Sequence, residues 1–290
     1  MEKKIQLVDG TKILVGLVGD PNKKVIMLPV AKPSVYGEEA ESLKHWGMDP
    51  HFGKHFVEGL SDDFQILYFD YEGHRFRHPQ PKDFSPDSIT KDLLTIADQM
   101  KIRTFSYYGY SWLALAGLQL DIRTDRLESL IMGGFPPVDG PYKEMLIVTR
   151  KTYEQALASQ NEFLVQEQEA ISHEEIDWEN IQVKIDPKQT QQFLKLYEAL
   201  ENFEDKTISL RSKIPRLGFA GEQDTIVYGE KFGNVTVDIV GALQKNKSNL
   251  EKQGWNIEIL KGSKMNHTKA MQPKVVLPLL KKWLKSQLGH

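Results

Sequence analysis

Short, largely apolar runs separated by helix-like stretches are the feature of this 290-residue chain that most restricts its fold. Each run is short enough for a buried strand, and they lie at residues 25–28, 64–69, 105–108, 127–132, 214–220 and 255–260. Between them, apolar residues recur at helical spacing, as in 86–100 and 274–288. Strands that alternate with helices form a mostly parallel sheet through right-handed crossovers, so we expect an α/β fold.

Two segments depart from this alternation. Residues 4–18 read as two β runs around Asp9-Gly10, which predicts an antiparallel hairpin at the start of the sheet. Residues 139–212 are rich in Glu, Gln and Lys and show helical spacing without a convincing strand. We therefore predict one core domain, residues 1–138 and 213–290, interrupted by a helical cap at 139–212.

Composition excludes several classes of function. With 37 basic and 40 acidic side chains and no long block of either sign, the sequence predicts neither a nucleic-acid nor a membrane partner. The absence of cysteine excludes disulfides, a thiolate nucleophile and sulfur-ligated metal. No stretch resembles a signal peptide or a membrane span of about 18 apolar residues, so the expected location is the cytoplasm.

Polar side chains follow three of the predicted strands. Ser111 follows the 105–108 run, Asp224 follows 214–220, and His267 follows 255–260. The carboxyl ends of parallel strands share one edge of a sheet, where ligands bind, so we expect these residues to meet. A hydroxyl nucleophile, an imidazole base and a carboxylate that orients the imidazole are what acyl transfer needs.

The order Ser, Asp, His along the chain is that of α/β-hydrolases, and the sequence resembles an α/β-hydrolase-fold serine hydrolase with a helical cap over nearly its whole length. The resemblance lies in four segments: Gly109-Tyr110-Ser111-Trp112 (nucleophile elbow), Asp70-Tyr71-Glu72-Gly73-His74 (the loop after the fourth strand), Gly221-Glu222-Gln223-Asp224 (acid loop) and Asn266-His267 (histidine loop). The chain departs from the family's G-x-S-x-G pattern at Leu113, which stands where the second glycine belongs.

The resemblance implies an oxyanion hole formed by two backbone N–H groups. One belongs to Trp112 and the other to Val30 or Ala31, because Pro29 has no N–H. Tyr110 and Phe135 are candidate substrate-binding residues, although Tyr110 could equally pack in the core. The family needs no cofactor or metal.

Other acidic and histidine residues compete with the three candidates for these roles. Glu222 and Asp238 are rivals of Asp224, whereas His290, at the end of the chain, is a poor rival of His267. His74 and His78 have a metal-like spacing, yet the basic residues between them, Pro79 after them and the lack of a suitable carboxylate favour structural or surface roles. His45, His51 and His55 are expected to be packing or surface residues.

The predicted function is hydrolysis of a small or medium acyl compound, an ester or a lactone, through an acyl-enzyme on Ser111. The same three residues also suit a proline-type aminopeptidase, a carbon–carbon bond hydrolase or an acyltransferase. A different class of function is a ligand-sensing or partner-binding protein of this fold with little turnover. The sequence predicts a small-molecule acyl substrate as the partner but specifies neither the compound nor the oligomeric state.

Overall fold

The computed structural model describes residues 1–166, 186–208, 210 and 213–289. Its main sheet has eight strands in the order β1-β2-β4-β3-β5-β6-β7-β10. Their bounds are β1 (Glu2–Gln6), β2 (Lys12–Val18), β3 (Val25–Leu28), β4 (Gln65–Tyr68), β5 (Phe105–Tyr110), β6 (Leu127–Gly133), β7 (Arg216–Gly221) and β10 (Trp255–Leu260). All pairings from β4 to β10 are parallel, while β2 is antiparallel to both β1 and β4. The predicted parallel sheet with an N-terminal antiparallel hairpin is confirmed.

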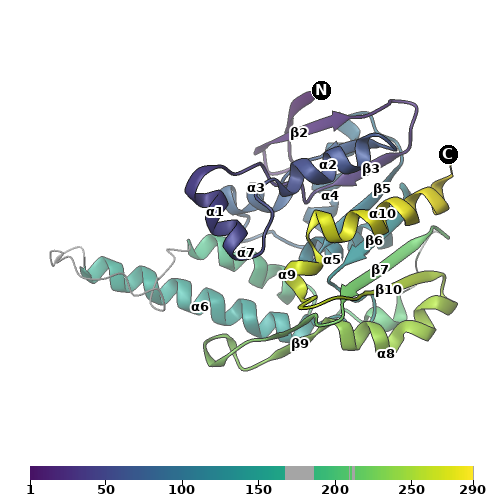
Figure 1. Ribbon diagram of the computed structural model, residues 1–290. Coiled ribbons are helices and arrows are strands. Elements are labelled where there is room, and N and C mark those ends of the chain that lie inside the picture. Colours follow the sequence, from purple (N-terminus) through teal and green to yellow (C-terminus); the bar gives the residue numbers. More distant parts are fainter. Residues whose placement is uncertain (167–185, 209, 211–212, 290) are drawn as a thin grey trace.

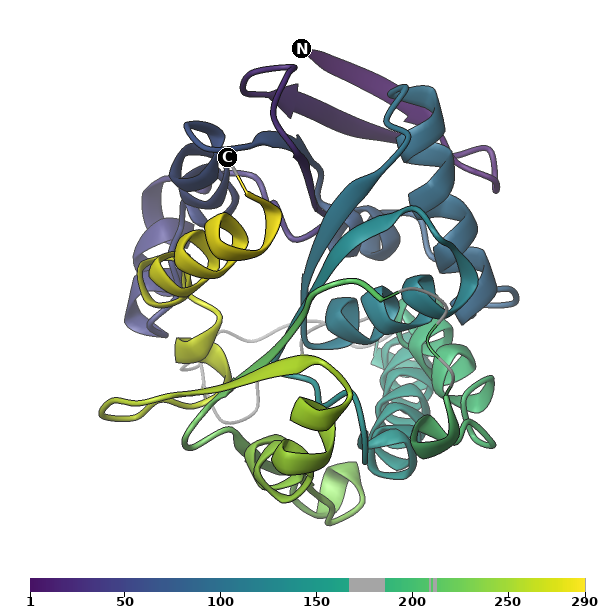
Figure 2. The same cartoon turned by 90° about the vertical axis from the view of Figure 1, so that its right-hand side faces the viewer.

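Helices cover both faces of this sheet (Figure 2). One face carries α2 (Phe52–Ser61) and α10 (Pro273–Leu288), and the other carries α4 (Pro86–Gln99) and α5 (Trp112–Arg123). Helix α5 is apolar around most of its circumference because it packs on β5, β6 and α4 at once. The remaining helices of the core are α1 (Gly37–His45), α3 (Tyr71–Arg77), α8 (Ile239–Lys252) and α9 (His267–Ala270).

The described part of the 139–212 segment is helical, as predicted. It contains α6 (Tyr142–Gln166), which projects from the body of the molecule, and α7 (Pro187–Glu198), which packs along it (Figure 1). The buried Gln192 joins α7 to the core: its Nε2 donates to the Arg75 carbonyl (3.0 Å) and its Oε1 accepts from the Gln80 N–H (3.2 Å). Most of the Gln166–Glu179 run lies outside the described residues, and the assignment of a separate cap domain stays a prediction.

Two local features differ from the sequence expectation. The residues expected to form a loop after the fourth strand begin helix α3, because the Asp70 carboxylate accepts a hydrogen bond from the Gly73 N–H (2.8 Å) and caps the helix. A short antiparallel pair, β8 (Thr225–Val227) and β9 (Thr236–Asp238), follows β7 and was not predicted. Its strands are too short and too exposed to give an apolar signal.

No helix among the described residues has both the length and the hydropathy needed to cross a membrane.

Candidate active site

Ser111 occupies a sharp turn between β5 and α5. Its backbone has φ 56° and ψ −130°, a conformation that is costly for a residue with a side chain. The Ser111 N–H donates to the Gly133 carbonyl on the neighbouring strand (2.8 Å), and the Ser111 carbonyl accepts from the Ala114 N–H (2.8 Å). These bonds hold the serine at the turn between strand and helix; its role as a nucleophile stays a prediction.

The elbow closes although Leu113 replaces a glycine. A Cβ at Gly109 would overlap the Leu113 carbonyl. Gly109, the first glycine of the motif, therefore lets the backbone of β5 lie close to the first turn of α5, because glycine has no side chain. The Leu113 side chain is buried, and its carbonyl accepts a hydrogen bond from the Tyr107 hydroxyl (2.8 Å). The leucine is therefore accommodated as a core residue.

His267 and Asp224 form a direct pair. His267 is the first residue of α9, and its Nδ1 lies 2.9 Å from Oδ1 of the fully buried Asp224. Tyr110 supports the same histidine, because its hydroxyl donates to the His267 carbonyl (2.8 Å) and its ring centroid lies 5.0 Å from the imidazole. The Asp224 carboxylate thus holds one imidazole nitrogen, and the Tyr110 ring packs against the imidazole.

The rival carboxylates have other partners. Glu222 accepts a hydrogen bond from the Gly262 N–H (2.8 Å) and lies 3.4 Å from the Lys261 ammonium. Asp238 caps α8 through the Gly241 N–H (3.0 Å) and accepts from the Thr225 hydroxyl (2.8 Å). Of these three carboxylates, Asp224 is the one that lies within hydrogen-bonding distance of the His267 imidazole.

Ser111 and His267 line the same cavity, which has a volume of about 260 Å³. Phe135 also lines it, whereas Tyr110 is buried beneath His267 and is not among the lining residues. Most of the wall is apolar or aromatic and comes from α6, α7 and the β8–β9 region: Met145, Thr149, Phe193, Tyr197, Ile226, Tyr228, Val237 and Ile239. Ser111 and His267 both belong to the described part of the chain, and no hydrogen bond joins the serine hydroxyl to the imidazole. In enzymes without bound substrate, catalytic hydrogen bonds of this kind are often long and tighten only when substrate binds.

The backbone N–H groups expected to form the oxyanion hole differ in their partners. Trp112 begins α5, so its N–H lies in the first turn, where a helix supplies no acceptor, and the residue lines the cavity. The Ala31 N–H already donates to the Phe69 carbonyl (3.1 Å), which favours Val30 as the second donor. Val30 itself is buried in a β-bridge with Asp70 and is not among the residues lining the cavity.

The Trp112 side chain is held by two residues that sequence reasoning missed. Its Nε1 donates to Glu72 (2.7 Å), whose other oxygen lies 2.6 Å from the Lys32 ammonium, and its ring contacts Phe193 of α7 with centroids 5.3 Å apart. These contacts join segments 40 or more positions apart in the sequence. No local pattern in the chain points to them.

His74, one of the two histidines with a metal-like spacing, has structural surroundings. His74 is buried with Nε2 3.0 Å from the Thr11 hydroxyl, and burial together with the positive charge of Arg75 lowers its pKa to about 4. Among the described residues, no three His, Cys, Asp or Glu side chains are placed to hold a metal ion. His290 lies outside the described residues.

Comparison with known proteins identifies the fold. No protein-family model matches the sequence. Karrikin insensitive 2 receptors B and IA of Petunia hybrida are each 31% identical to it, over 107 and 102 residues respectively. The match to receptor B spans 35% of this chain and 39% of the receptor.

Solved structures resemble the chain over almost its whole length. A 1H-3-hydroxy-4-oxoquinoline 2,4-dioxygenase aligns with a TM-score of 0.60 at 15% identity, covering 98% of this chain and 99% of that one. An esterase from Exiguobacterium antarcticum aligns at 0.57 and 16% identity (98% and 100% covered), and a metagenomic epoxide hydrolase of the alpha/beta hydrolase superfamily at 0.56 and 15% (100% and 99%). The chain therefore has the α/β-hydrolase fold, and identities this low show the fold alone.

Proposed function

We propose that the protein is a serine hydrolase that cleaves an ester or lactone of small to medium size without a cofactor. The observation that carries the proposal is the convergence of Ser111, on a strained elbow, and the His267–Asp224 pair at one cavity. Neighbours of the same fold include an esterase and an epoxide hydrolase, which supports a hydrolase-type activity.

The proposed reaction uses each group for one task. The His267 nitrogen that does not face Asp224 takes the Ser111 proton as the hydroxyl attacks the carbonyl carbon, and returns it to the leaving alcohol. Asp224 holds the tautomer and stabilises the imidazolium. Water activated by the same imidazole then cleaves the acyl-enzyme, which releases the acid and restores Ser111.

The tetrahedral oxyanion would be held by the Trp112 and Val30 N–H groups. Trp112 lies at the positive end of the α5 dipole, which also favours a negative charge there. Loss of one such donor typically costs about 3 kcal/mol of transition-state stabilisation.

The cavity wall favours an uncharged, apolar acyl group. None of the described lining residues is an Asp, Glu, Lys or Arg. A proline-type aminopeptidase must bind the free amino group of its substrate, and the described residues of this wall offer no carboxylate to do so. Among the activities that the three residues suit, ester or lactone cleavage fits the wall best.

The test is labelling with a fluorophosphonate probe, followed by a panel of p-nitrophenyl esters of graded chain length, lactones and proline amides. We expect stoichiometric labelling and turnover of at least one short or medium ester or lactone, both abolished in Ser111→Ala. A folded wild-type protein that neither reacts with the probe nor turns over any compound would contradict the proposal.

A ligand sensor with little turnover is the second candidate, supported by the 31% match to two proteins described as receptors. The same cavity would then hold a ligand without cleaving it. A compound that raises the melting temperature of both wild type and Ser111→Ala, with no product from either, would favour this function over hydrolysis.

A further inference from the structure

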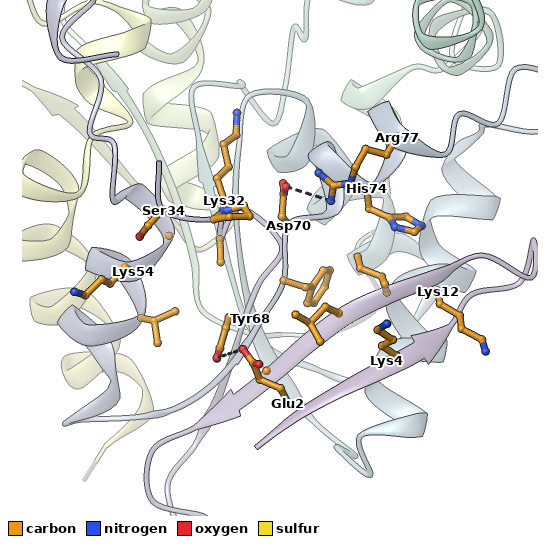
Figure 3. A pocket seen from close by; sticks show the side chains of 18 of the residues that line it. Glu2, Lys4, Lys12, Lys32, Ser34, Lys54, Tyr68, Asp70, His74 and Arg77 are labelled. Carbon is orange, nitrogen blue, oxygen red and sulfur yellow. Dashed lines mark hydrogen bonds and ion pairs between the residues drawn. The ribbon is translucent and has the colours of Figure 1, made fainter. Parts of the chain in front are cut away.

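A second and larger hollow lies outside the site described above. This groove, about 570 Å³, is bounded by the β1–β2 hairpin, helix α2 and the loop at residues 31–34 (Figure 3). It shares no lining residue with the cavity that contains Ser111. Its volume falls in the range of small-molecule sites, which is about 300–1,000 Å³.

The floor of the groove is apolar. Tyr68 on β4 pairs with Gly16 on β2, and its ring covers this glycine so closely that a Cβ at Gly16 would overlap it. Leu14, Val57 and Phe69 continue this surface, and Leu14 is 53% exposed although it is a large apolar side chain. The floor therefore offers apolar area that no other part of the described chain covers.

The rim of the groove is charged, with an excess of cations. Lys4, Lys12, Lys32, Lys54 and Arg77 line it against three carboxylates, Glu2, Glu58 and Asp70. Three of the cations have acidic partners: Lys32 with Glu72 at 2.6 Å, Lys54 with Glu58 at 3.8 Å, and Arg77 with Asp70 at 3.8 Å.

Lys4 and Lys12 are the cations with no ion pair among the described residues. They lie on adjacent strands of the hairpin, because Lys4 pairs with Leu14 and Gln6 with Lys12 (Figure 3). Both therefore stand on the face of the hairpin that carries Leu14, beside the apolar floor.

We propose that this groove binds a small organic anion with an apolar body, of the medium-chain carboxylate class. The carboxylate would pair with Lys4 and Lys12, and the hydrocarbon chain would cover Leu14, Tyr68 and Val57. Two lysines that have no ion pair within the described part of the chain lie next to exposed apolar area. This arrangement favours a ligand with both a negative charge and an apolar body over a fully polar anion or a neutral hydrocarbon.

The first experiment is isothermal titration calorimetry with octanoate, using 1-octanol as the uncharged counterpart. We expect saturable 1:1 binding of octanoate, weaker binding of octanol, and at least a tenfold loss of octanoate affinity in Lys4→Glu/Lys12→Glu. The control Lys252→Glu/Lys274→Glu makes the same charge change on exposed residues of α8 and α10 and should bind like wild type. Absence of binding to the wild type, or equal loss in both double variants, would overturn the proposal.

A second pair of variants locates the bound anion, because octanoate could also enter the apolar cavity beside Ser111. Val57→Trp fills the groove and Ile226→Trp fills that cavity; both residues are partly exposed, so both variants should fold. We expect only Val57→Trp to weaken binding. Loss of binding confined to Ile226→Trp would place octanoate in the candidate active site and refute the proposed groove site. Both measurements report binding, so neither depends on whether Ser111 turns over a substrate.

Discussion

At the scale of single residues, Asp224 and Glu222 show how two carboxylates two positions apart acquire different roles. Asp224 is fully buried and lies against His267, whereas Glu222 is partly exposed and joins the Gly262 N–H to Lys261. Both residues lie in the turn region between β7 and β8, where no strand or helix periodicity assigns a side chain to one face, so chain position alone does not separate them. The proposed function makes only Asp224 part of the reaction.

Asp224→Asn should lower kcat by about 10³–10⁴-fold, because an amide cannot hold the imidazole tautomer or stabilise its charged form. Glu222→Gln is the matched control and should change kcat less than about twofold. Steady-state kinetics with whichever ester or lactone the wild type cleaves gives both values. Similar losses in the two variants, with both proteins folded, would contradict the assigned role of Asp224.

At the scale of elements, the crossing of β5 and α5 positions Ser111 in the candidate site. The strand ends at a strained serine, and the helix starts so close to the strand that Gly109 has no room for a Cβ. Two hydrogen bonds hold this crossing in place: the Tyr107 hydroxyl donates to the Leu113 carbonyl, and the Ser111 N–H donates to the Gly133 carbonyl on β6. The strain at Ser111 is offset by these contacts, which form only when the sheet is complete.

Gly109→Ala should lower the free energy of unfolding by about 1–3 kcal/mol, because backbone atoms at the crossing must move apart. Gly229→Ala is its control: that glycine has φ −71° and open space where a Cβ would lie, so its stability should change by less than about 0.5 kcal/mol. Urea unfolding of both variants measures the difference, and equal stabilities would show that the crossing is not tightly packed.

At the scale of the whole molecule, the buried Arg75 joins three distant parts of the chain. Its guanidinium lies 2.7 Å from Asp9 in the hairpin turn and 2.7 Å from Asp92 on α4, and Asp92 also accepts a hydrogen bond from Tyr71 (2.7 Å). Burial would raise the pKa of Asp9, but the hydrogen bonds from Thr11 and Arg75 outweigh it and lower the pKa to about 2. This charged cluster holds the hairpin, one wall of the groove, against the core.

The adjacent His74 gives the protein a specific pH dependence. Its pKa is about 4 in the folded protein and near 6.5 in an unfolded chain, so only the unfolded chain takes up a proton between these values. Stability from this histidine is complete above pH 6.5 and lost as the pH falls towards 4, by about 3 kcal/mol. Urea unfolding of wild type and His74→Gln across this range should show the extra loss in wild type alone; parallel curves would contradict it.

Apolar periodicity predicted the main strands, the N-terminal hairpin and the long helices, because side chains that repeat every two or 3.6 residues report burial locally. The same periodicity missed β8 and β9, which are short and mostly exposed, and α3, whose start depends on the Asp70 carboxylate. Within the candidate site, strand ends pointed to Ser111, Asp224 and His267, but Glu72 and Phe193 gave no local signal.

The sequence by itself determined the α/β architecture and the chain positions of a hydroxyl, a carboxylate and an imidazole. Only the tertiary structure decided that Asp224 rather than Glu222 meets His267 and that Tyr110 lies beneath the histidine instead of lining the cavity. It also placed Lys4 and Lys12 beside an apolar floor, with no ion pair to any described residue. The physical reason is that secondary structure follows from neighbours a few residues away. The partner of a side chain is set by segments that meet only when the sheet closes.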